Sequence, residues 1–91
     1  MKIKFFSTYR EIAGLKEVEI PAVPDIWSLL VQLGGQYGSA FKKVIFTPDE
    51  TDINEEMIIF VNGQNISYLG GKNTPLADTD TISIFPQIDG G

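Results

Sequence analysis

The stretch Met57-Ile58-Ile59-Phe60-Val61-Asn62-Gly63 decides how the rest of the chain folds. Its first five residues form a continuous apolar run, which is typical of a buried strand near the centre of a sheet. Asn62-Gly63 is a strong hairpin signal, because a type I′ turn needs a positive φ at both central positions. Residues 64–69 are therefore expected to return as the partner strand.

A helix is predicted upstream of this hairpin, over residues 25–37. Apolar residues recur there at helical spacing, at Ile26, Leu29, Leu30, Leu33 and Tyr37. Asp25 fits the N-cap position and Gly38 the C-cap position. The dipeptide Gly34-Gly35 weakens the end of the helix. The apolar stripe of such a helix must lie on a sheet, and a short helical turn is added over residues 40–46.

The two ends of the chain supply the remaining strands. Residues 2–9 and 16–20 alternate apolar and polar side chains, with a turn at 11–14, and predict an antiparallel hairpin. Residues 81–85 predict a last strand, inserted parallel to the first. The expected fold is α+β, a β-grasp (ubiquitin-like) domain with a mixed sheet of about five strands and one main helix. Residues 1–91 form a single domain, with 86–91 as a flexible C-terminal tail.

Composition limits the functions that are open to the chain. Its 91 residues are 43% hydrophobic and 21% charged, an ordinary balance for one globular domain. Seven basic and twelve acidic residues give a net charge of −5, which disfavours nucleic-acid binding and suits a partner with a basic docking face. The absence of Cys and His excludes thiolate nucleophiles, imidazole bases and the usual zinc ligands. No signal peptide or membrane-spanning run is visible, so a cytoplasmic location is expected.

Two segments resemble binding motifs without meeting their requirements. Residues 47–56 are acidic but lack the ligand spacing and the central glycine of a calcium loop. Gly70-Gly71-Lys72-Asn73 lacks the earlier glycine and the final Ser or Thr of a phosphate-binding loop. We therefore expect this chain to bind neither a metal nor a cofactor of its own.

The last seven residues, Phe85-Pro86-Gln87-Ile88-Asp89-Gly90-Gly91, carry the candidate chemistry. Gly90 and Gly91 have no Cβ and can enter a channel too narrow for other residues. Fully extended, residues 86–91 reach about 20 Å, enough to place the terminal carboxylate inside another protein's active site. Taken alone, two terminal glycines fit a frayed chain end equally well.

Four groups of residues are similar to the MoaD/ThiS family of ubiquitin-like sulfur carriers, and most similar to its MoaD branch, the small subunits of molybdopterin synthase. They are Lys4-Phe5-Phe6-Ser7-Thr8-Tyr9-Arg10-Glu11-Ile12-Ala13-Gly14, Val61-Asn62-Gly63, Thr74-Pro75-Leu76 with Asp78 and Asp80, and Phe85-Pro86 with Gly90-Gly91. Gln87, Ile88 and Asp89 depart from the Pro-Val-Ala that such tails often carry.

The resemblance implies a carrier with no independent catalysis. A MoeB-like adenylyltransferase would join the Gly91 carboxylate to AMP from ATP, and a persulfide sulfur would displace the AMP to leave a thiocarboxylate. A MoaE-like large subunit, assembled with this chain as a hetero-oligomer, would deliver the sulfur to a cyclic pyranopterin and form the molybdopterin dithiolene. Gly90 would enter the partner's channel with Gly91. The expected partner-binding residues are Phe60, Phe85, Pro86, Gln87, Ile88 and Asp89, although Phe60 and Phe85 fit the core equally well.

Other functions use the same residues differently. A sulfur donor for tRNA thiolation, or a protein modifier joined to lysines through Gly91, would need the same tail. A non-catalytic β-grasp interaction domain would not need the two glycines. An enzyme in its own right is the least expected, because the sequence offers no nucleophile–base pair or metal set.

Overall fold

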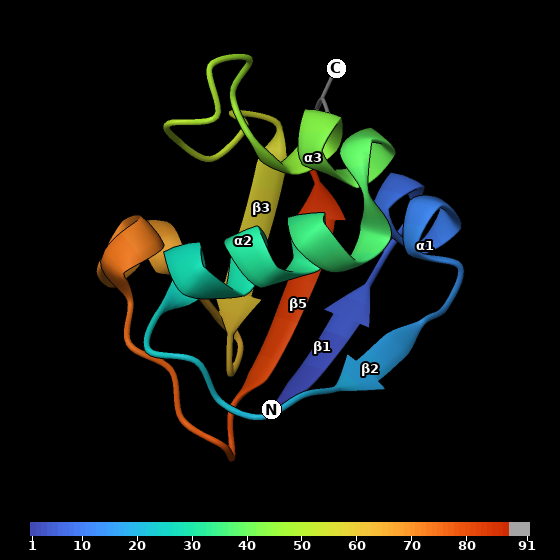
Figure 1. Ribbon diagram of the computed structural model, residues 1–91. Coiled ribbons are helices and arrows are strands. Elements are labelled where there is room, and N and C mark those ends of the chain that lie inside the picture. Colours follow the sequence, from blue (N-terminus) through green and yellow to red (C-terminus); the bar gives the residue numbers. More distant parts are fainter. Residues whose placement is uncertain (88–91) are drawn as a thin grey trace.

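The computed structural model describes residues 1–87, which form a five-stranded sheet with helices on one face (Figure 1). The strands are β1 Lys2–Phe5, β2 Glu17–Glu19, β3 Met57–Val61, β4 Gln64–Asn65 and β5 Thr81–Pro86, in the order β2-β1-β5-β3-β4. The helices are α1 Thr8–Ala13, α2 Ile26–Tyr37 and α3 Ser39–Ile45, with 3₁₀ turns η1 Ile66–Tyr68 and η2 Gly71–Asn73. β1 and β5 are parallel and the other neighbours antiparallel, which confirms the predicted α+β, β-grasp arrangement.

Alternation along the strands separates a covered face of the sheet from an uncovered one. Ile3 and Phe5 of β1 are fully buried, as are Ile82 and Ile84 of β5. Helix α2 crosses the sheet on the covered side (Figure 1). It contributes four side chains with no exposed surface, Ile26, Leu29, Leu30 and Leu33. Burying each such side chain contributes about 1.5–3 kcal/mol to the stability of the fold. The hydrophobic core is therefore the layer of side chains between the helices and the covered face of the sheet.

Three local predictions are confirmed. The Asp25 carboxylate accepts a hydrogen bond of 2.8 Å from the Ser28 amide at the start of α2, and this bond lowers the pKa of Asp25. Gly38, with a φ of 88°, ends α2 and begins α3. Asn62 and Gly63 have φ values of 51° and 85°, as the type I′ turn after β3 requires.

The first strand is shorter than predicted, because a helix occupies the segment where we expected the strand to continue and then turn. β1 ends at Phe5, and α1 follows it until Gly14, whose φ is 81° and whose amide donates to the Arg10 carbonyl at 2.9 Å. Tyr9, only 3% exposed, holds α1 against the core through a T-shaped contact with Phe41 at 6.2 Å. The described chain therefore has α1 in addition to the predicted main helix α2 and to α3, which lies where the short helical turn over residues 40–46 was expected.

The hairpin after β3 also differs from prediction. β4 spans two residues, because Ile66 turns inward and the Asn65 carboxamide accepts a hydrogen bond from the Ser67 amide at 2.9 Å, starting η1. The run in β3 is buried only at alternate positions, and Ile58 and Phe60 lie half-buried on the uncovered face. The inference of a strand buried on both faces was wrong, since helices cover one face alone.

Gly34 and Gly35 are neighbours on α2 with opposite surroundings. A Cβ at Gly34 would lie 3.0 Å from Cγ of Lys42 and 3.3 Å from the Phe46 ring on the α3 side, whereas a Cβ at Gly35 meets nothing within 4 Å. Alanine stabilises a helix interior by about 0.5–1 kcal/mol relative to glycine. We expect Gly35→Ala to raise the free energy of unfolding by about this amount, and Gly34→Ala to gain less or to destabilise. Urea unfolding measures both, and equal stabilisation would contradict the close packing of α2 on α3.

Tyr9 gives the fold a dependence on alkaline pH. Its hydroxyl donates to the Val44 carbonyl at 3.3 Å, and burial, with a smaller effect of the Glu56 carboxylate, raises its pKa from 10.0 to about 12. The unfolded chain therefore ionises first, so the stability that Tyr9 contributes is complete below pH 10.0 and is lost as the pH rises toward about 12. We expect the free energy of unfolding to fall over this range less steeply in Tyr9→Phe than in the parent. Tyr37 is present in both proteins, so parallel curves would show that Tyr9 does not cause the decline.

Candidate functional site

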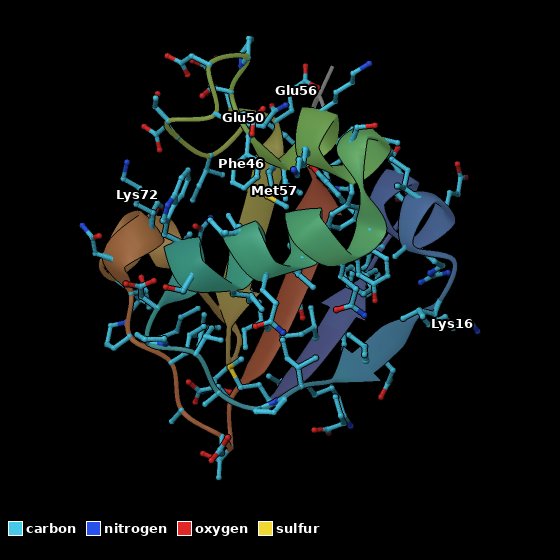
Figure 2. All side chains as sticks on the ribbon, in the orientation of Figure 1. Lys16, Phe46, Glu50, Glu56, Met57 and Lys72 are labelled. Carbon is cyan, nitrogen blue, oxygen red and sulfur yellow. The ribbon has the colours of Figure 1, made fainter. Side chains whose placement is uncertain are left out.

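Pro86, predicted as the first residue of the tail, is instead the last residue of β5, at the end of the β3–β5 ladder. Pro86 pairs with Met57, and the Gln87 amide donates to the Glu56 carbonyl at 2.6 Å. The predicted site residues Ile88, Asp89, Gly90 and Gly91 lie outside the described residues. A fully extended segment of four residues spans at most about 14 Å. The hydrogen bond to Glu56, a residue labelled in Figure 2, thus fixes the position of Gln87, to which the last four residues are attached.

Three aromatic rings lie side by side on the uncovered face at this end of the sheet. Phe6 meets Phe85 edge-on at 6.0 Å, and Phe85 meets Phe60 at 5.2 Å. Phe60 and Phe85 are half-buried and Phe6 is 36% exposed, so none of the three belongs to the core. We call these three residues the aromatic row. The row brings the predicted residues Phe60 and Phe85 together and places both on the surface of the sheet and not in the core.

Phe6 is a member of the row that the sequence analysis did not select as a site residue. The signal was present, because Phe6 falls on the side of the first strand opposite the buried Ile3 and Phe5. Its amide donates to the Ile84 carbonyl at 3.1 Å, so the pairing with β5 continues for one residue beyond the end of β1. Phe6 is therefore held next to Phe85 by the backbone as well as by ring contact.

A hollow of about 380 Å³ follows the aromatic row along β5. Its lining consists of Phe6, Ser7, Phe60, Gly63, Ser83, Phe85 and Pro86. Ser83 pairs across the strands with Phe60, and its short side chain leaves space between the larger rings. Side chains that anchor protein interfaces are commonly aromatic or fill pockets between aromatic groups. The hollow thus suits an apolar side chain supplied by another protein.

Another hollow, of about 420 Å³, lies between α3 and the acidic loop of residues 47–56 and is lined by residues such as Lys42, Phe46 and Glu50. In that loop the Thr47 and Thr51 hydroxyls donate to Asp49 at 2.8 Å each and lower its pKa, so this carboxylate serves the loop's own structure. Within residues 1–87 no group of three or more carboxylates is placed to hold a metal ion. No helix in this part of the chain has the length and apolar character needed to cross a membrane.

Known proteins share this sequence pattern and this fold. The model of a family described as the ThiS family matches residues 3–91. Small archaeal modifier protein 3 of Haloferax volcanii is 27% identical over 93 residues, covering 100% of this chain and 98% of that protein. The solution structure of small archaeal modifier protein 1 from Methanosarcina acetivorans is 36% identical with a TM-score of 0.85, covering 99% of this chain and 94% of that one.

Two further solved structures bear on how such proteins are used. A putative molybdopterin converting factor subunit 1 from Pyrococcus furiosus is 25% identical with a TM-score of 0.69, covering 96% of this chain and 95% of that one. CysO of Amycolatopsis orientalis, in a complex with BexX, shares the fold at 20% identity and a TM-score of 0.79, covering 99% of this chain and 98% of that one. With its match over residues 3–91 and its β-grasp sheet, this chain belongs to the ThiS family, the ThiS/MoaD group of ubiquitin-like sulfur carriers and modifiers.

Proposed function

We propose that this chain is a carrier whose C-terminal Gly91 carboxylate is activated by an ATP-dependent partner enzyme in the cytoplasm. The observation that carries this proposal is the position of the aromatic row. The row includes Phe85 of β5, the strand that leads directly into the tail. An enzyme that holds Gly90 and Gly91 can cover the row at the same time. The folded body then contributes position, and the partner contributes acids, bases and cations.

Activation makes a poor electrophile reactive. An oxygen of the Gly91 carboxylate attacks the α-phosphorus of ATP, the bond from that phosphorus to the bridging oxygen breaks, and pyrophosphate leaves. The terminal sulfur of a persulfide then attacks the acyl carbon of the adenylate, and AMP leaves. A thiol attacks the other sulfur of the acyl disulfide, which releases the thiocarboxylate and leaves the donor and the thiol joined as a disulfide. The persulfide and the thiol supply every electron that these steps require.

Three fates of the activated carboxylate are candidate functions. Transfer of the activated glycine to target lysines is supported by the small archaeal modifier relatives, which are 27% and 36% identical. Sulfur delivery to a cyclic pyranopterin within a MoaE-like subunit, as in molybdopterin synthase, is supported by the relative from Pyrococcus furiosus at 25% identity. Sulfur delivery to tRNA would use the same thiocarboxylate. Transfer to lysines is supported at least as well as delivery to a pterin, and all three fates need a MoeB-like activating step.

One incubation distinguishes these fates. The purified chain is mixed with ATP, the adenylyltransferase of the same cells, a sulfur-labelled persulfide donor, a thiol and the candidate acceptors (protein, tRNA and a cyclic pyranopterin), and its intact mass is recorded. Exchange of one terminal oxygen for sulfur supports a sulfur carrier. A protein adduct at lysine that survives reduction supports a modifier, whereas labelled sulfur in a pterin or in tRNA identifies the acceptor. If neither adenylate nor thiocarboxylate forms, the proposed function is wrong.

Gly91→Val tests the need for a bare terminal residue. We expect pyrophosphate exchange to fall by about a hundredfold or more, since a misplacement of about 1 Å at a reacting group can cost that much. Thermal unfolding should match that of the parent, because valine replaces the final residue, beyond the β3–β5 ladder. A chain extended by one residue after Gly91 is the matched control, since it keeps both glycines and blocks the carboxylate. Exchange near the parental rate in either variant would contradict activation at Gly91.

Phe60→Ala and Phe85→Ala test whether the aromatic row is the docking surface. Truncation of an aromatic anchor commonly weakens an interface by 2 kcal/mol or more, so we expect the KM for the carrier in pyrophosphate exchange to rise about tenfold or more, with kcat retained. Val31→Ala is the control, because Val31 is an apolar side chain on α2, 51% exposed and outside the row. A KM that changes equally in all three variants would show that the row has no special role.

A further inference from the structure

Basic side chains gather at one end of the aromatic row, on a chain whose net charge is −5. Lys4, Arg10 and Lys16 line a hollow of about 190 Å³ together with Phe5, Phe6 and Glu17. We call the three cations and the space between them the basic hollow. Lys4 comes from β1, Arg10 from α1 and Lys16 from the residue before β2, so the fold brings them together. Figure 2 shows Lys16 at the edge of the molecule beside β2.

The cations of the basic hollow have no carboxylate partner within residues 1–87. The ion pairs in this part of the chain join Met1 to Glu19, Lys2 to Glu17, and Lys72 to Asp52. Glu17, which also lines the hollow, is therefore the partner of Lys2, at 3.7 Å. Three cations and one carboxylate therefore line the hollow, and that carboxylate is paired with Lys2 outside it. The excess of positive charge suits a negative group supplied by another molecule.

Arg10 is held in place beside the row. Its Nε donates to the Phe5 carbonyl at 3.3 Å, and its guanidinium carbon lies 5.7 Å from the centre of the Phe6 ring. These contacts occupy one N–H and one face of the guanidinium group. The two terminal amino groups remain to bind a carboxylate, whose planar geometry matches them. Because Phe6 also contacts Phe85, one ring joins the basic hollow to the aromatic row.

The position of the basic hollow relative to the tail indicates its occupant. β1 and β5 are parallel, so Phe6 after the end of β1 and Pro86 at the end of β5 lie at the same end of the sheet. Next to β3, the acidic loop of residues 47–56 lies at this end, where Figure 2 shows Glu50 and Glu56. This end of the sheet therefore carries cations near β1 and anions near β3. A protein that binds the tail must approach both the cations and the anions.

We propose that the enzyme that adenylates Gly91 inserts an Asp or Glu side chain into the basic hollow, while an apolar side chain of the same enzyme covers the aromatic row. This inference rests on the proposed function and adds the chemistry of the partner's surface. The basic hollow and the acidic loop carry opposite charges at the same end of the sheet, and such an arrangement fixes the orientation of a partner more than it adds to the affinity. A uniformly basic partner face, expected from net charge alone, would be repelled by Arg10.

The test is the KM of the enzyme for the carrier in ATP–pyrophosphate exchange, measured at low and at physiological salt. We expect Arg10→Ala to raise this KM about threefold to tenfold and Lys16→Glu to raise it further, with kcat unchanged. Both effects should shrink as salt is added, because the hollow is open to solvent. Lys43→Ala is the matched control, since Lys43 is an exposed cation on α3 outside the basic hollow. Arg10→Lys should fall between the parent and Arg10→Ala.

Two further measurements keep the outcomes distinct. Arg10→Ala removes a hydrogen bond to the backbone, so thermal unfolding is recorded for every variant; Lys16→Glu alters a side chain for which the described residues show no hydrogen bond. Rescue of Arg10→Glu by an Asp→Lys or Glu→Lys substitution in the enzyme identifies the partner carboxylate. Exchange with the parent but an unchanged KM in both variants overturns this inference alone. No exchange with the parent overturns the proposed function together with it, and self-association that Arg10→Ala abolishes assigns the hollow to a second copy.

Discussion

The parallel pairing of β1 with β5 is the interaction on which the rest of the molecule depends. It joins the first strand of the chain to the last, in the register that places Ile3 beside Ile82 and Phe5 beside Ile84. Parallel strands require a long crossover connection, and everything between Phe5 and Thr81 serves as that connection. Because the two strands also end on the same side of the sheet, the residues after β1 lie next to the base of the tail. The aromatic row beside the base of the tail is thereby built in part from Phe6, near the N-terminus.

The division of the sheet into two unlike faces follows from the length of the chain. One layer of helices buries the core side chains on the covered face, and a chain of 91 residues has no second layer for the other. A sheet with one solvated face usually carries polar side chains there. Here the uncovered face carries Phe6, Phe60 and Phe85 next to the strand that leads to the tail. Apolar side chains left in this position favour an interface over incidental exposure.

Local signals in the sequence predicted the parts of the fold that local chemistry controls. Asp25 caps a helix and Asn62-Gly63 makes a turn because their own backbone and side-chain geometry suffices. The residues of α1 form a single short helix that depends on Tyr9 packing against Phe41, a contact between segments far apart in the sequence. No pattern of spacing contains that contact, so the sequence predicts strand and turn for the segment after the first strand.

The same limit applies to the candidate site. An apolar run such as Met57–Val61 indicates a strand but does not say whether both of its faces are covered, so Phe60 could not be assigned from the sequence. The basic hollow depends on α1, because Arg10 reaches Phe6 only if the chain turns back after β1. The terminal glycines, in contrast, could be singled out at once because their chemistry needs no fold. The sequence thus indicates the candidate reactive end, and the structure is needed for the surface beside it.

Selection among partners must come mainly from that surface. Gly90 and Gly91 offer a partner only backbone atoms and one carboxylate, which any protein ending in two glycines would offer equally. An enzyme that read the terminus alone could not distinguish one such carrier from another. The aromatic row supplies shape, and the opposed charges of Arg10 and the acidic loop supply direction. Under the proposed function, the enzyme that recognises these two features also acts on the chain end, so that recognition of the body and chemistry at Gly91 would occur in a single complex.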